Sequence, residues 1–432
     1  LHQHTAQSIN ADTLARLSRA VIMKPTSYFV VLAFLVMAIS ILFNARPAEA
    51  QSGIELENVQ ASHRFGESIT FVATIQAAIP IQNVSIVISD EAQRLNHVAT
   101  LVPQTDGRTE YRLDTKQTLL RPFTLVKWNY QFTLSDGSVL QSESFFVRYT
   151  DNRFNWQILE SSTARVNWYE GDANFGQAIL NAVQAGLTSV SQLMTGGNQA
   201  QPIEVYIYAN TDDLAGTLAL GGENWVAGHA DPALGVMMVV VEPGAQQGIT
   251  MEQRLPHELM HIIMYRAVGP GYYNIPVWLR EGMATLAEMY PNADYDRVLA
   301  DASAGNRLIP LKDLCVSFPA DRGQAFLAYA EARSFTNYLY RTYGSGTRGL
   351  QSLITSYASG VDCEHGPERE LDASLSSLEM NWRSSVLGQN TLLSALQNIS
   401  PYLVLLCLIL IVPFIGILIT LRKKGSQNGS ES

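Results

Sequence analysis

The chain has 432 residues, of which 47% are hydrophobic and 16% are charged, and these proportions exclude an intrinsically disordered protein. Its net charge of -10 at pH 7 excludes nucleic acid as a partner, because nucleic-acid-binding proteins present clustered Lys and Arg. The length suffices for two or three domains, each with its own core.

An apolar run at residues 28–43 predicts a secretory signal peptide. It is followed by the motif Ala-Glu-Ala at 48–50, which is typical of a signal-peptidase site. We expect the signal to occupy residues 23–50, the upstream residues 1–22 to be an unstructured extension, and the mature chain to begin at Gln51. The alternative is an uncleaved anchor, for which the apolar run is short.

Residues 51–150 have the pattern of a β-sandwich. Apolar and polar side chains alternate in short runs rich in Val, Ile, Thr and Phe, such as SITFVATIQ and ESFFVRYT. Asp-Gly turns at 106–107 and 136–137 separate these runs. We therefore expect an antiparallel sandwich. It contains no cluster of catalytic residue types, so we expect it to serve as a spacer or a binding module.

Residues 155–388 are expected to form a second domain, because helical spacing now alternates with strands. The run PIEVYIYAN predicts one strand, and GVMMVVVEPG predicts a second, more apolar one. The fold class is therefore α+β, with the sandwich first and an α+β domain after it.

The segment HELMH, which the chain is expected to enter through Pro256, carries the candidate chemistry. His257 and His261 lie about one helical turn apart, so their imidazoles can share one zinc ion. Glu258, next to the first histidine, can accept the proton of a metal-bound water. The alternative is a pair of buried core histidines. A third ligand decides between the two, because catalytic zinc has three protein ligands and one open position.

Glu281 is the candidate third ligand, 20 residues after His261 (281 − 261 = 20), in a segment patterned as a helix. The pair HELMH and WLREGMATLAE resembles the gluzincin metallopeptidases, particularly the M1 branch and the small peptidase MA-like domains. The resemblance covers about residues 155–387. It implies a peptide or protein substrate and zinc held by His257, His261 and Glu281.

The second helix departs from the thermolysin pattern, which places an aspartate four residues after the ligand glutamate. Thr285 stands there, so Glu288, seven residues after Glu281 as in the M1 pattern, is the candidate for holding a histidine. A metzincin is excluded, because its third histidine would occupy the position of Ala267. No G-A-M-E-N-type motif is present, which leaves exopeptidase and endopeptidase activity both open.

The remaining parts of a hydrolytic site follow from the chemistry of peptide cleavage. A developing oxyanion needs a hydrogen-bond donor, for which Tyr329 is the first candidate and His229 the second. Either residue could instead be structural. Glu258 would act as general base, and the strand at 236–241 would pair with an extended peptide.

An uncharged apolar run at 402–421 predicts a transmembrane helix. The basic residues that follow it place the tail, 422–432, in the cytoplasm and the preceding domains outside it. The chain would then be a single-pass protein of the cell membrane. Cys315 and Cys363, the only cysteines outside the apolar run, are expected to form a disulfide in that oxidising space, the alternative being two free thiols.

These features together predict a membrane-anchored zinc metallopeptidase with its ectodomain outside the cytoplasm. One alternative is a non-catalytic binding protein with a degenerate peptidase domain, and another is a zinc amidohydrolase of a non-peptide substrate. A degenerate domain usually lacks the base or a ligand, whereas this chain keeps all four residues. The sequence does not indicate the oligomeric state.

Overall fold

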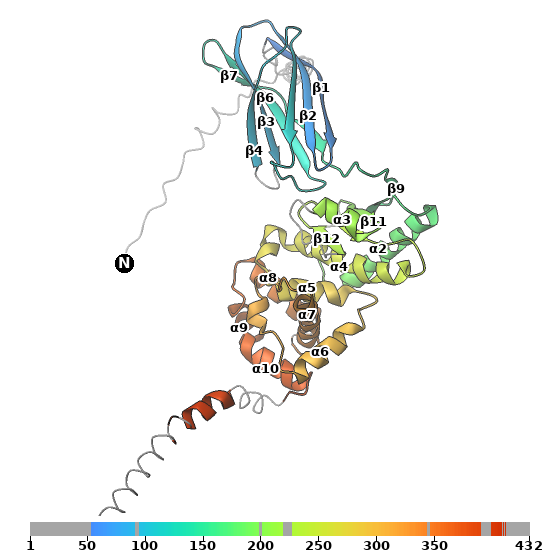
Figure 1. Ribbon diagram of the computed structural model, residues 1–432, viewed down its shortest axis with the longest axis vertical. Helices are drawn as coiled ribbons and strands as arrows, with labels where there is room; N and C mark the ends of the chain where they lie inside the picture. The colour runs from blue at the N-terminus through green and yellow to red at the C-terminus, as the bar shows by residue number, and fades with distance from the viewer. Residues whose placement is uncertain are drawn as a thin grey trace, which may run out of the picture.

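The computed structural model describes residues 53–90, 95–197, 201–218, 227–343, 346–389, 399–407, 409 and 411. The predicted upstream extension, signal peptide and cytoplasmic tail lie outside the described residues. Figure 1 shows a β-sheet domain at the N-terminal side and a helix-rich domain after it.

The N-terminal domain is a sandwich of two antiparallel sheets. One sheet has the strand order β1-β2-β5, and the other has the order β4-β3-β6-β7 with β8 also paired to β6. The strands are β1 (Ile54–Arg64), β2 (Ser68–Ala77), β3 (Ile81–Asp90), β4 (Leu95–Leu101), β5 (Arg108–Asp114), β6 (Leu125–Leu134), β7 (Val139–Gln141) and β8 (Phe145–Arg148). Alternate side chains point into the core, where Phe71 packs edge-on against Trp128 of the opposite sheet with ring centroids 5.1 Å apart.

The second domain is built on a five-stranded sheet with the order β12-β13-β11-β10-β9. The strands are β9 (Gln157–Glu160), β10 (Ala164–Trp168), β11 (Ile203–Tyr208), β12 (Gly228–Asp231) and β13 (Val236–Val240). The three central strands are parallel, and the two outer strands are antiparallel to their neighbours.

The sheet edge differs from the sequence-based expectation. We expected the strand at 236–241 to be exposed, but β13 is hydrogen-bonded on both sides and β12 forms the edge. All five residues of β13 are buried. A continuous apolar run is typical of a strand that is covered on both faces, which is the physical reason why β13 lies inside the sheet.

Helices cover this sheet and form the rest of the domain (Figure 1). They are α2 (Ala173–Leu193), α3 (Thr211–Leu218), α4 (Gln247–Val268), η1 (Gly269–Asn274), α5 (Val277–Ala287), α6 (Asp294–Ala304), η2 (Leu311–Leu314), α7 (Arg322–Thr342), α8 (Thr347–Ala358), α9 (His365–Leu371) and α10 (Leu375–Ser385). Helix α4 packs between α2 and α5, and α5 packs on α7. Gly282 permits that last contact, since a Cβ atom there would overlap the side chain of Thr336.

Buried contacts join the two domains. Phe123, in a loop of the sandwich, is fully buried in the apolar cluster on one face of the second sheet. Its ring stacks on Tyr206 with centroids 3.8 Å apart. Close by, Arg121 of the same loop forms a 2.7 Å ion pair with Asp231 at the end of β12. The sandwich therefore contributes directly to the core of the second domain.

The predicted transmembrane helix at 402–421 is wrong. Among the residues that the structure describes, no helix is both long and apolar enough to cross a membrane. Most of the predicted segment lies outside the described residues. The fold class is corrected to α+β without this element.

Candidate metal centre

Helix α4 carries both candidate histidines, and it begins at Gln247 rather than at Pro256. A proline inside a helix has no N–H, so the carbonyl of Glu252 loses its partner within the helix. That carbonyl instead accepts a 2.9 Å hydrogen bond from the backbone N–H of Met289. Pro256, one residue before His257, therefore frees the carbonyl of Glu252, and this carbonyl ties the chain after α5 to α4.

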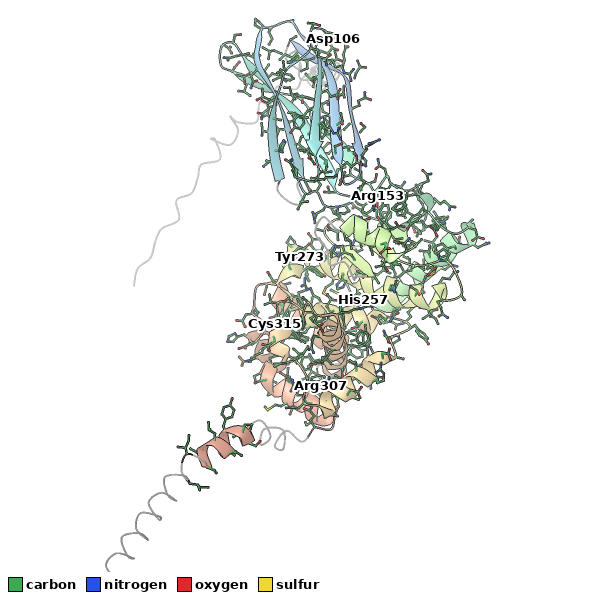
Figure 2. The ribbon with its side chains drawn as sticks, viewed as in Figure 1. Asp106, Arg153, His257, Tyr273, Arg307 and Cys315 are labelled. Carbon is green, nitrogen blue, oxygen red and sulfur yellow. A yellow bond between two sulfur atoms is a disulfide. The ribbon has the colours of Figure 1, made fainter. Side chains whose placement is uncertain are left out.

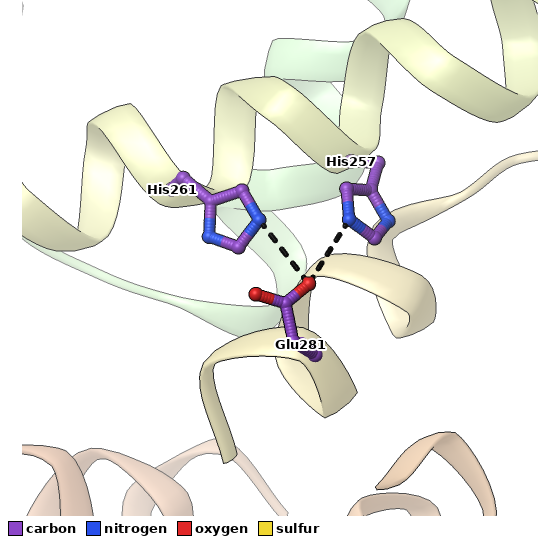
Figure 3. A group of neighbouring side chains, drawn as sticks. All are labelled: His257, His261 and Glu281. Atoms are coloured by element: carbon purple, nitrogen blue, oxygen red, sulfur yellow. Dashed lines mark ion pairs between the residues drawn. The ribbon is translucent and has the colours of Figure 1, made fainter. Parts of the chain in front are cut away.

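Three side chains converge between α4 and α5 (Figure 3). Nε2 of His257 lies 3.4 Å from Oε2 of Glu281, and Nε2 of His261 lies 3.6 Å from the same oxygen. All three ligand atoms lie within 4.8 Å of one another. Tetrahedral zinc with bonds of about 2.0–2.1 Å separates its ligands by roughly 3.3 Å, so this donor set fits one zinc ion.

The outer nitrogen of each histidine has a partner of its own. Nδ1 of His257 is 3.0 Å from Oε1 of Glu288, and Nδ1 of His261 is 2.9 Å from the hydroxyl of Tyr272. When each Nδ1 donates its proton to these oxygens, each Nε2 keeps its lone pair for a metal. The structure thus brings Glu288 to His257, and it adds Tyr272, a residue of η1 that no sequence pattern indicated.

The electrostatics of the cluster favour a cation. Burial raises the pKa of Glu281, but the charges and hydrogen bonds of His261 and His257 outweigh burial and lower this pKa well below its usual value. Burial also opposes a charge on His257, yet its hydrogen bonds with Glu281 and Glu288 hold its pKa well above the usual value. The carboxylates therefore attract positive charge to the space between them, which a metal ion can supply.

Glu258 lies beside the converging ligands and is only 7% exposed. The edge strand β12 passes close to it at Gly228, where a Cβ atom would lie 2.5 Å from Oε1 of Glu258. A larger residue at this position would displace the carboxylate of Glu258 from where it lies. A pocket of about 570 Å³ opens here, bounded by β12, α4, the chain that follows α5, and α7.

The two candidate oxyanion donors lie in different places. Tyr329 of α7 lines the pocket, and its ring centroid is 6.1 Å from that of His257. His229 follows Gly228 on β12, and successive strand residues face opposite sides, so its exposed side chain points away from Glu258. The structure therefore brings Tyr329 to the site and leaves His229 outside it.

Cys315 and Cys363 form the predicted disulfide, with their Cα atoms 6.1 Å apart. The carbonyl of Cys315 accepts a 2.9 Å hydrogen bond from the N–H of Val277, and the sulfur of Cys363 lies 3.4 Å from the indole nitrogen of Trp278. Figure 2 shows Cys315 within the helix-rich domain. Because α5 begins at these contacts, the disulfide fixes the start of the helix that carries Glu281.

Residues 182–388 match the family model of the Peptidase MA superfamily. The chain therefore contains a peptidase MA-like domain. The matched residues include α4 and α5, which carry the converging histidines and glutamate.

Solved structures resemble the chain only weakly. A chain described as a myokine structure is 16% identical to this chain, with a TM-score of 0.18. The match covers 22% of this chain and 95% of that chain. The polysaccharide deacetylase BC0361 from Bacillus cereus is 8% identical, with a TM-score of 0.18, and the match covers 46% of this chain and 65% of that chain. The purple acid phosphatase PPD1 from yellow lupin is 10% identical, with a TM-score of 0.20, and the match covers 48% of this chain and 40% of that chain. Such scores carry no argument about function. No curated protein matches the chain.

Proposed function

We propose that the chain is a zinc-dependent metallopeptidase of the gluzincin type, which hydrolyses peptide bonds. The observation that carries the proposal is the convergence of His257, His261 and Glu281 beside Glu258, within a peptidase MA-like domain. Zinc held by the three ligands would supply a Lewis acid that activates water and polarises the scissile carbonyl.

The side chains of the pocket supply the proton transfers and the positioning. Glu258 accepts a proton from the attacking water and delivers it to the leaving amine nitrogen. We assign the hydroxyl of Tyr329 as the donor to the oxyanion, since this residue lines the same pocket. Glu288 and Tyr272 hold the two imidazole rings in orientation through their Nδ1 atoms.

Strand β12 supports binding of the peptide backbone. It is the edge of the sheet next to the pocket, and the described residues pair with it on the β13 side only. An extended peptide can add to such an edge through main-chain hydrogen bonds. Gly228 would then hold that peptide close to Glu258.

We also propose that the protein works outside the cytoplasm. The disulfide between Cys315 and Cys363 supports this placement, because disulfides persist in oxidising compartments and are rare in the cytosol.

Metal analysis combined with hydrolysis of a quenched fluorescent peptide library tests the proposal. We expect one zinc ion per chain, and peptide cleavage that a chelator abolishes and added zinc restores. A purified protein that binds no zinc and cleaves no peptide would be a non-catalytic binding protein instead. A zinc-containing protein that cleaves only non-peptide amides would be an amidohydrolase of another class.

A further inference from the structure

Two arginines line the pocket next to the candidate metal centre. Arg254 lies on α4 three residues before His257, which places it one turn earlier on the same face. Arg322 is the first residue of α7, on another wall of the pocket. Among the residues described, no carboxylate lies within ion-pair distance of either guanidinium. The pocket therefore contains two guanidinium groups without a direct ion pair, and the nearby charge of Glu258 acts on Arg254.

The guanidinium of Arg254 is held in place by a backbone carbonyl. Its Nη1 atom donates a 2.6 Å hydrogen bond to the carbonyl of Val240, at the end of β13. A guanidinium has five N–H donors, and among the described residues no other acceptor is bonded to this one. The group is partly buried, and arginine keeps its charge even where burial lowers its pKa, as it does here.

The rest of the lining combines aromatic side chains with two carboxylates. Phe326, Tyr295 and Tyr329 line the pocket, and the rings of the first two lie 5.1 Å apart. Arg254 is half-buried beside these rings, whereas Arg322 is exposed at the rim of the pocket. The pocket also contains the carboxylates of Glu258 and Glu288, but the second is bonded to His257 and the first is reserved for proton transfer in the proposed reaction.

We propose that Arg254 and Arg322 together bind a carboxylate of the substrate, on a residue next to the scissile bond. This inference rests on the proposed peptidase function and adds the substrate class. The preferred substrates are peptides that place either an acidic side chain or their own C-terminal carboxylate in the pocket. Guanidinium groups recognise carboxylates through paired, charge-assisted hydrogen bonds, which a neutral amide does not match.

Matched peptides test this selectivity. One series carries Glu, Gln or Lys on either side of a single cleavable bond, with an amidated C-terminus, and a second series repeats the neutral peptides with a free C-terminus near that bond. We expect kcat/KM for the Glu peptide to exceed that for the Gln peptide by at least about tenfold, the contribution of a charge-assisted hydrogen bond. A preference seen only in the second series would identify the C-terminal carboxylate as the ligand.

Variants then assign the preference to these arginines. Arg322→Gln and Arg254→Gln should each bring the Glu-to-Gln ratio towards one. The matched control is Arg341→Gln, an exposed position at the other end of α7 that does not line this pocket, and it should keep the native ratio. Equal rates for charged and neutral peptides in both series, or unchanged ratios in both pocket variants, would overturn the inference and leave the peptidase function standing.

Binding separates failure of the inference from failure of the proposed function. If no peptide is cleaved, fluorescence anisotropy measures binding of the labelled peptides to the unaltered chain and to both arginine variants. Tighter binding of carboxylate peptides that is lost in Arg322→Gln would support the carboxylate site while refuting the peptidase function. Equal binding of charged and neutral peptides would overturn the carboxylate site as well.

Discussion

Replacing Glu288 with Gln tests how the metal centre is held. Oε1 of Glu288 lies 3.0 Å from Nδ1 of His257, and the residue is only 8% exposed. Glutamine keeps the shape and an acceptor oxygen but removes the charge, and a charge-assisted hydrogen bond is roughly twice as strong as a neutral one. Loss of such a partner weakens metal binding by about 10–100-fold, or about 1.4–2.7 kcal/mol.

The assay is competition for zinc between the protein and a chelating indicator, with circular dichroism to verify that each variant is folded. Tyr272→Phe is the matched control, because it removes a neutral partner of His261 at 2.9 Å rather than a charged one. We expect it to weaken zinc binding less than Glu288→Gln does. Native zinc affinity in folded Glu288→Gln, or a larger loss in Tyr272→Phe, would refute this reasoning.

Three further predictions concern stability. Phe123→Ala should lower the free energy of unfolding by about 3–5 kcal/mol in urea titrations, because the ring is fully buried between the domains. The control is Leu119→Ala in the same loop region. Leu119 is 52% exposed, so this change should alter the free energy of unfolding little. The double replacement of Cys315 and Cys363 by Ser should cost about 2–4 kcal/mol in the same titrations, and equal stability with and without the disulfide would contradict its role in fixing α5. Burial raises the pKa of the fully buried Glu331 from 4.5 to about 8, so the folded state is favoured at acidic pH and loses this contribution as the pH rises from about 4.5 to about 8. Glu331→Gln does not titrate, so its stability relative to the native chain should increase by about 2 kcal/mol between about pH 5 and about pH 7, and thermal melts showing a constant difference would exclude this pKa shift.

The chemistry of the site could be predicted where it follows from the period of a helix. His257 and His261 lie four residues apart, which fixes their common face before any tertiary contact is known. Glu281 on the next helix and Glu288 directly after it were assigned with the resemblance to gluzincins, and the structure brings both to the histidines.

Other features depend on contacts between segments that no local pattern encodes. Tyr272 contacts His261 from the 3-10 helix η1, whose side-chain positions do not follow from the periodicity of α4. The sequence contains Gly228, but the close approach of β12 to Glu258 at this residue could be recognised only in the structure. Pro256 suggested the start of a helix because proline is best tolerated there. Its cost within α4 is offset by a backbone hydrogen bond from a different part of the chain.

The fold shows the same division. Alternating side chains predicted the sandwich, because one face of each of its sheets is buried. The edge of the second sheet could not be inferred in the same way. Strand β12 has four residues, which is too short for a clear pattern of alternation. The more apolar β13 was therefore predicted to be the edge strand instead. Apolar character alone also led to the membrane-spanning helix that the described residues do not support.

The zinc content and peptidase activity of two single variants, measured side by side, test the central claim most directly. Glu258→Gln removes the base but no ligand, so it should retain one zinc ion while activity falls by at least about a hundredfold. Glu281→Gln removes an anionic ligand, so it should lose both zinc and activity. If Glu258→Gln loses zinc as readily as Glu281→Gln, or if Glu281→Gln retains full zinc occupancy and rate, the assignment of these residues to a zinc peptidase centre is contradicted.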